Sequence, residues 1–170
     1  MINRRTYFVA IALILLLFAA SVNAGHVQLP KGKEVYLKFS SDLKVSSGEY
    51  KKGDSIPVML DQPIDIGGQI IVDRGAAGTA VVLDAEKNGS GGKAGMIKIG
   101  FVNLQPKGEY KLSEGGVISL GGNPLEFKGK KKGIFPYLFF VIILKGGNGE
   151  VPTDAVYTAT VAETVVLENE

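Results

Sequence analysis

Short apolar segments with alternating or β-branched character recur along the chain, separated by turn residues. In residues 34–39, Val35, Leu37 and Phe39 alternate with other side chains, which is the pattern of a half-buried strand. Similar segments lie at residues 56–60, 69–72, 78–83, 96–104, 110–112, 117–120 and 155–167. After residue 24 no window shows a convincing amphipathic helical repeat. The pattern predicts an all-β fold, a single-domain β-barrel or β-sandwich of short antiparallel strands with glycine-rich turns.

The turns predict how these strands connect. Residues 65–101 hold apolar strands tied by glycine turns and are expected to form the structural centre of the fold. The Pro-Lys-Gly-Glu sequence at 106–109 predicts a hairpin, and Gly-Gly-Asn-Pro at 121–124 predicts a break. Residues 27–32 are expected to form a turn, and residues 155–167 one long final strand. Leu29-Pro30 before Val35, and Val151-Pro152 before Val156, open two strands alike, which predicts that the first and last strands pair.

The first 24 residues have the pattern of a secretory signal peptide. Arg4 and Arg5 precede an apolar run at residues 8–20, and small residues precede Gly25. A permanent anchor helix is the alternative, but the apolar run is short against the roughly 20 residues that span a bilayer. Residues 25–170 are then one mature β domain of ordinary size. The predicted location is outside the cytoplasm, in the periplasm or cell envelope, with the periphery of the outer membrane as one option.

Composition excludes several functions. The chain has 19 basic and 17 acidic residues, no cysteine and a single histidine. Because Arg4 and Arg5 leave with the leader, the mature domain carries no net charge, and general attraction to nucleic acid is not expected. Thiolate metal sites, cysteine nucleophiles and multi-histidine centres cannot be built. The single histidine, His26, stands two residues past the predicted cleavage site, where chains are commonly frayed, and this argues against a serine–histidine triad. A lipid anchor on cysteine is excluded as well. We expect no cofactor, and no metal, catalytic or cofactor-binding residue is assigned.

The turn motifs resemble those of other exported proteins. LPKGKEVYLKF, KKGDSIPVML, IIVDRGAAGTAVV and MIKIGFVNLQPKGEYKL look like a diffuse group of exported bacterial β domains. They are distantly similar to the C-terminal β-barrel domain of the VirB10/TrbI family of type IV secretion components. The resemblance covers about residues 29–112 and the final strand. It implies a β fold in an envelope setting and no functional residues, and the chain lacks the long proline-rich spacer of that family.

Three groups of residues resemble known functional sites, but each lacks a residue or an element that such a site needs. Residues 84–89 begin like a calcium loop, but Gly95 stands where the bidentate glutamate belongs, so a polar hairpin turn is favoured. Residues 89–95 resemble a phosphate loop, but no helix follows, so a mobile hairpin loop is favoured. The carboxylates of Asp54, Asp61 and Asp65 could supply an acid/base pair for glycoside hydrolysis. Acids near turns are ordinary surface residues, and the chain has no tryptophan for a sugar to stack on.

The most unusual segment is a lysine-flanked apolar insertion at residues 128–150. We call its uncharged run, residues 134–144, the apolar tongue. As a helix it would extend about 16 Å, too short for a bilayer of roughly 30 Å, and it lacks the alternation of a transmembrane strand. Either it is a buried element, as a central strand or a short helix starting at Pro136, or it is an exposed tongue that meets a membrane interface or a partner. The candidate interaction surface is Lys128, Lys130, Lys131, Lys132, Phe135, Tyr137, Phe139 and Phe140.

The sequence therefore predicts a non-enzymatic cell-envelope module with a structural or interaction role. Its expected partner is an envelope protein or a membrane surface. A β domain that binds glycan or peptidoglycan is the alternative, and a carboxylate-dependent hydrolase is the weakest.

Overall fold

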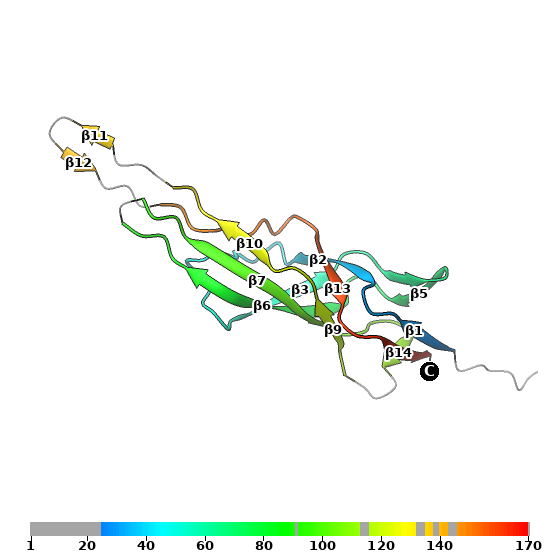
Figure 1. The fold of residues 1–170 in the computed structure, drawn as a ribbon. Coiled ribbons are helices and arrows are strands. Elements are labelled where there is room, and N and C mark those ends of the chain that lie inside the picture. The colour runs from blue at the N-terminus through cyan, green and yellow to red at the C-terminus, as the bar shows by residue number, and fades with distance from the viewer. Residues whose placement is uncertain are drawn as a thin grey trace, which may run out of the picture.

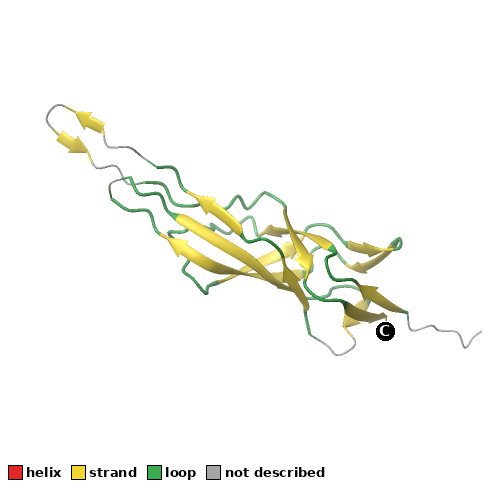
Figure 2. Ribbon diagram, in the orientation of Figure 1, coloured by secondary structure: helices red, strands yellow, loops and turns green. Residues whose placement is uncertain are grey.

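The computed structural model describes residues 25–90, 92–112, 116–131, 135–137, 140–142 and 146–169. In these residues all regular structure is β-strand (Figure 2). The strands are β1 (His26–Leu29), β2 (Glu34–Phe39), β3 (Ser55–Leu60), β4 (Ile64–Ile66), β5 (Gln69–Val72), β6 (Ala77–Glu86), β7 (Met96–Leu104), β8 (Tyr110–Leu112), β9 (Ile118–Gly121), β10 (Leu125–Lys128), β11 (Phe135–Tyr137), β12 (Phe140–Ile142), β13 (Tyr157–Val161) and β14 (Val165–Asn169). A search of this described part found no helix with the length and apolar character needed to span a membrane.

Six antiparallel strands close into a barrel, in the order β7–β6–β3–β2–β13–β9 (Figure 1). Closure comes from β9, which pairs with β13 through Leu120 and Gly121 and with β7 through Ile118 and Ser119. The prediction of an all-β fold is confirmed, and the barrel is the form that it takes. A closed sheet of this kind leaves no free strand edge along its regular part.

The barrel interior is a packed apolar core. Along β2 and β3 every second side chain points inward and is buried, as the alternation in the sequence predicts. Phe39 lies at the centre of an aromatic group, with ring centroids 6.2 Å from Phe101 and 5.5 Å from Tyr157. The largest fully buried side chains are Phe39, Leu29, Leu37, Ile56, Leu60, Ile71, Ile97, Ile99, Leu104, Ile118, Leu167 and Val35.

Strands β9 and β10 share one edge of β7. Leu104 and Asn103 of β7 pair with β9, whereas residues 96–99 of β7 pair with β10. The predicted break at residues 121–124 begins at Gly121, the last residue of β9, and separates β9 from β10 along this side of β7. β10 itself was missed by the sequence pattern because only Leu125 and Phe127 are apolar and both remain partly exposed.

A three-stranded sheet, β1–β14–β8, closes one end of the molecule. It corrects three expectations from the sequence. Residues 26–29 form a strand and not part of a turn, because Leu29 is fully buried and β1 pairs with β14. Residues 106–109 do not make a hairpin, because β8 pairs with β14 and not with β7. The expected long final strand is divided at residues 162–164, so that β13 joins the barrel and β14 joins this sheet.

The predicted pairing of the first and last strands is confirmed twice. β1 pairs with β14, and β2 pairs with β13 in a register that sets Val35 opposite Ala159 and Leu37 opposite Tyr157. The two proline-led turns therefore deliver neighbouring strands to the same region of the sheet.

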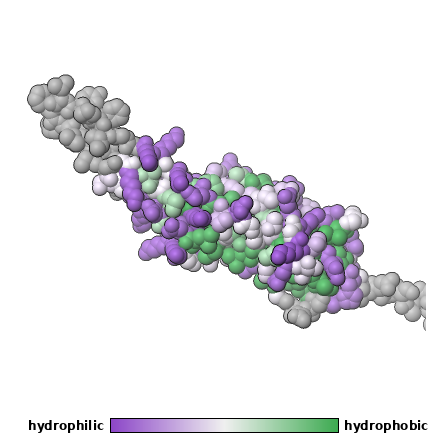
Figure 3. All heavy atoms as spheres, viewed as in Figure 1, coloured by the Kyte–Doolittle hydropathy of each residue, from purple (hydrophilic) through white to green (hydrophobic). Residues whose placement is uncertain are grey.

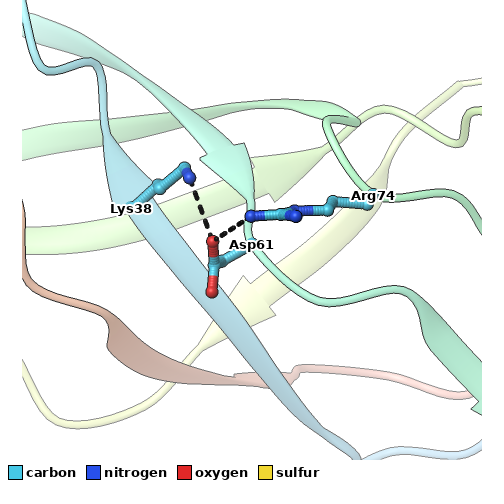
Figure 4. Close-up of polar contacts among 3 residues, drawn as sticks. All are labelled: Lys38, Asp61 and Arg74. Atoms are coloured by element: carbon cyan, nitrogen blue, oxygen red, sulfur yellow. Dashed lines mark hydrogen bonds and ion pairs between the residues drawn. The ribbon is translucent and has the colours of Figure 1, made fainter.

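Asp61 fixes the point at which the chain leaves β3. Its Oδ1 atom lies 3.0 Å from Lys38 Nζ of β2 and 3.2 Å from Arg74 Nη2 of the turn before β6 (Figure 4). The Asp61 side chain is only 15% exposed, and its backbone N–H donates to the Tyr36 carbonyl at 2.7 Å. The hydrogen bond from Lys38 is the main cause that lowers the pKa of the Asp61 carboxyl, and Arg74 adds to it. One carboxylate thus ties three segments of the barrel wall.

The substitution Asp61→Asn should lower the melting temperature at pH 7. Because the folded-state pKa of Asp61 is depressed, its charge stabilises the fold above the unfolded-state pKa, near 3.8. That contribution is lost as the pH falls through the folded-state value. Melting curves of both proteins from pH 7 to pH 2 should therefore approach each other only below about pH 3.8, as the Asp61 carboxyl becomes protonated. A difference that stays constant with pH would show that the charge of Asp61 is not what stabilises this corner.

Candidate functional site

The apolar tongue contains a small β-hairpin. β11 and β12 pair antiparallel, with Phe135 opposite Ile142 and Tyr137 opposite Phe140, and they form a two-stranded sheet of their own. Figure 1 places this hairpin beyond the end of the barrel at which β10 ends. The expectation of one central strand or of a short helix from Pro136 is wrong, because Pro136 lies within β11, opposite Val141.

The predicted interaction residues fall into three groups. Lys128, Lys130 and Lys131 lie on β10 and the segment that follows it, and all three are exposed. Phe135 and Tyr137 belong to β11, and Phe140 belongs to β12. Lys132 and Phe139 lie outside the described residues.

The tongue rises from a base in which irregular segments continue the barrel wall. We define the tongue base as residues 45–48, 88–90, 92–95, 129–130 and 146–150. Gly129 N–H donates to the Gly95 carbonyl at 2.8 Å, Gly95 N–H to the Gly147 carbonyl at 2.9 Å, and Gly147 N–H to the Lys130 carbonyl at 2.9 Å. The two arms that lead into the tongue are therefore hydrogen-bonded to each other and to the loop between β6 and β7.

Glycine allows these segments to approach so closely. A methyl group added at Gly129 would overlap the backbone of Gly147, and one added at Gly149 would overlap the Phe127 carbonyl. At Gly95 the added carbon would lie 2.8 Å from the Glu86 carbonyl oxygen. None of these three glycines has a positive φ, so the requirement is space and not backbone conformation. The glycines of the insertion and of the preceding loop thus have a packing role that their sequence context did not reveal.

Two polar side chains complete the tongue base. Ser47, which is fully buried, exchanges bonds with Gly149: its N–H donates to the Gly149 carbonyl at 2.9 Å, and its Oγ accepts from Gly149 N–H at 3.1 Å. Asn88 Nδ2 donates to the Gly146 carbonyl at 2.6 Å. The predicted hairpin between β6 and β7 is confirmed, but its loop does not project freely, because Asn88 and Gly95 are bound to the arms of the tongue.

Charged side chains surround this end of the barrel, where Figure 3 shows hydrophilic residues gathered. Lys128 Nζ lies 2.6 Å from Glu126 Oε1, and Lys93 Nζ lies 3.1 Å from Glu86 Oε2. The hydrogen bond to Glu126 raises the pKa of Lys128. Both pairs are exposed, so each contributes little to stability, and each carboxylate offsets the charge of its lysine.

The acidic residues that were weighed as a catalytic pair each have a local partner. Asp54 Oδ2 accepts from Lys51 N–H at 2.8 Å, and Asp65 Oδ1 accepts from Gly68 N–H at 3.2 Å. Asp61 is held by Lys38 and Arg74, and its pKa is lowered, opposite to the shift that a general acid needs. Within the described residues, no three His, Asp or Glu side chains gather as a metal would require.

Comparison with known proteins found no matching family, no matching curated protein and no matching solved structure. The resemblance to the VirB10/TrbI barrel therefore stays a prediction.

Placing a methyl group in the tongue base should destabilise the protein. Gly129→Ala should cost about 1–3 kcal/mol of unfolding free energy, because the backbone of Gly147 must move. Gly121→Ala is the matched control, since its added carbon would meet Ala162 at an ordinary 3.7 Å. Urea denaturation of both variants measures the effect. Equal stability of the two variants would contradict a close-packed base.

Proposed function

We propose that the protein is a non-enzymatic module of the bacterial cell envelope that makes its contact through the apolar tongue. The observation that carries this proposal is the hairpin β11–β12. It pairs with itself and is set beyond the barrel, on a base fixed by hydrogen bonds between backbone segments. A segment presented in this way supports a contact role better than a role in the core.

The chemistry of the tongue fits an anionic membrane surface. The uncharged run 134–144 carries Phe135, Tyr137, Phe139 and Phe140, and four lysines precede it. Aromatic and aliphatic side chains favour the boundary between headgroups and acyl chains, while nearby lysines are attracted to anionic lipids. The exposed Lys130 and Lys131 stand at the foot of the tongue, where they can reach headgroups as the hairpin enters the interface.

Export follows as part of the same proposal. β1 begins at His26, so cleavage after residue 24 leaves the first strand complete. The mature domain then works on the outer side of the cytoplasmic membrane. A distant kinship with envelope-associated VirB10/TrbI barrels is compatible with that setting.

Removal of the tongue should abolish membrane binding without unfolding the barrel. Because Gly147 N–H donates to the Lys130 carbonyl, an Asn-Gly pair in place of residues 132–145 leaves a four-residue hairpin loop, from residue 131 to residue 146, that can close the two arms. This loop-closed variant should keep the barrel's melting transition and lose flotation with phosphatidylglycerol vesicles. An unfolded variant would mean that the tongue belongs to the core. A folded variant that still floats would place the contact elsewhere.

The contribution of Lys130 and Lys131 to membrane binding should increase with the negative charge of the lipid. Lys130→Gln with Lys131→Gln should weaken binding to phosphatidylglycerol vesicles about 30-fold, at about 1 kcal/mol for each lysine. The effect should shrink in 0.5 M salt and vanish on phosphatidylcholine vesicles. Lys51→Gln with Lys52→Gln changes an exposed lysine pair on another loop and is the control. If wild type binds neither vesicle, a protein partner replaces the membrane as the target of the tongue.

A further inference from the structure

The barrel wall opens between β2 and β4. β3 pairs with β2 only through residues 58–60, and the last bond of this ladder is Asp61 N–H to the Tyr36 carbonyl. After Asp61 the chain that follows β3 diverges from β2 and continues into β4, which pairs with β5. A cavity of about 480 Å³ lies at this divergence. We call it the β2–β4 groove, and its lining is Gly32, Lys33, Glu34, Val35, Tyr36, Gln62, Pro63, Ile64 and Asp65.

One wall of the groove is a strand edge of β2. The Tyr36 carbonyl faces the β3 side, since it accepts from Asp61. Main-chain groups alternate in direction along a strand, so the N–H and C=O of Glu34 face the same side as those of Tyr36. The paired residues of β3 end at Leu60, opposite Leu37. The main-chain groups of Glu34 therefore face the groove.

The opposite wall is a strand edge of β4. β4 and β5 are joined by Gly67 and Gly68, both with positive φ, and Ile66 pairs with Gln69 across this two-residue turn. The residues next to such a turn bond to each other, so the main chain of Asp65 is directed away from β5. Because Asp65 lines the groove, donors and acceptors of the main chain stand on both walls.

The side chains of the groove differ between floor and rim. Val35 and Ile64 line the groove but are 1% and 2% exposed, so they belong to the core and offer the groove almost no free surface. The rim carries Lys33, Glu34 and Asp65, and the Glu34 carboxylate accepts a hydrogen bond from the Tyr36 hydroxyl at 3.3 Å. Two carboxylates against one amine make the rim acidic overall.

From these observations we propose that the groove binds an extended peptide segment of a partner protein, which adds as a strand between β2 and β4. Main-chain bonds to two facing edges supply affinity, as in other cases of strand addition. The side chain that points inward is apolar, because the positions it faces, Val35 and Ile64, offer no side-chain hydrogen-bonding group. The side chains that point outward include a basic residue, because the rim is acidic. A volume of about 480 Å³ is in the range of ordinary ligand pockets.

This site is separate from the tongue. β5, the partner of β4, lies toward the end of the molecule away from β11 and β12 (Figure 1). One molecule can therefore hold a peptide in the groove while its tongue is engaged, and the failure of either proposal leaves the other intact.

Amide hydrogen exchange of the free protein tests whether the edge is open. The amide of Glu34 should exchange at least about tenfold faster than those of Val35 and Leu37, which face β13. Equal protection of the three amides would show that the edge is already covered, and it would overturn the proposal.

A phage-displayed library of random heptapeptides, selected on the signal-free chain, tests binding. Selected peptides should alternate apolar and polar residues, carry Lys or Arg, and protect the Glu34 amide from exchange. Glu34→Pro removes the N–H at the first residue of β2, a place where proline is tolerated. Glu34→Ala removes the same carboxylate but keeps the N–H, so it is the reference, and Glu34→Pro should bind selected peptides about tenfold more weakly than Glu34→Ala.

Measurement of Glu34 protection in wild type keeps the test decisive even if the proline variant does not fold. Selected peptides that bind without protecting Glu34 would overturn the proposal. The proposal would also be overturned if soluble peptidoglycan glycan strands protected the Glu34 amide and no selected peptide did. The loop-closed variant should bind selected peptides as wild type does, because the groove does not depend on the tongue.

Discussion

The structure depends on closure of the barrel by one short strand. β9 bridges β13 and β7 through a few residues, and without it the sheet β7–β6–β3–β2–β13 would have two free edges. Because the sheet is closed, its inward side chains form a single apolar core without a disulfide, in a chain that has no cysteine. The same closure restricts where other molecules can add. New contacts must be made where regular pairing stops.

In the described part of the chain, regular pairing stops at the tongue base and at the divergence of β3 from β2, and each is a candidate site. At one end glycines bring backbone segments together, and Gly129, Gly95 and Gly147 continue the wall by hydrogen bonds. There the chain can extend as a hairpin without exposing the core beneath it. Near the other end β3 leaves β2 at Asp61, and the wall divides around a groove. The ion pairs of Asp61 with Lys38 and Arg74 hold that division in place. The two sites therefore follow from one property of the barrel.

Much of the fold was predictable because strands with one buried face alternate strictly in sequence, as in β2 and β3. Pairing was less predictable, since the turn at residues 106–109 is a good hairpin sequence and β8 nevertheless pairs with β14. Here the distant Leu167 supplies the partner of Leu112, and no local pattern carries that information. The tongue stood out in sequence by its lack of charge. Its base did not, because close approach at Gly129 and Gly149 is a property of segments that are far apart in the chain. The groove left no sequence signal, because it arises where the edges of β2 and β4 that face each other lack a partner strand among the described residues.

The most direct measurement of whether the tongue is a contact surface uses the absence of tryptophan from the chain. Tyr137→Trp places a single indole on β11, and its fluorescence reports the surroundings of the tongue. We predict the emission of a water-exposed indole in the free protein. On addition of phosphatidylglycerol vesicles it should shift to shorter wavelength and become shielded from acrylamide. A short-wavelength, shielded emission in the free monomer that vesicles leave unchanged would contradict the account, because it would place the tongue in the core.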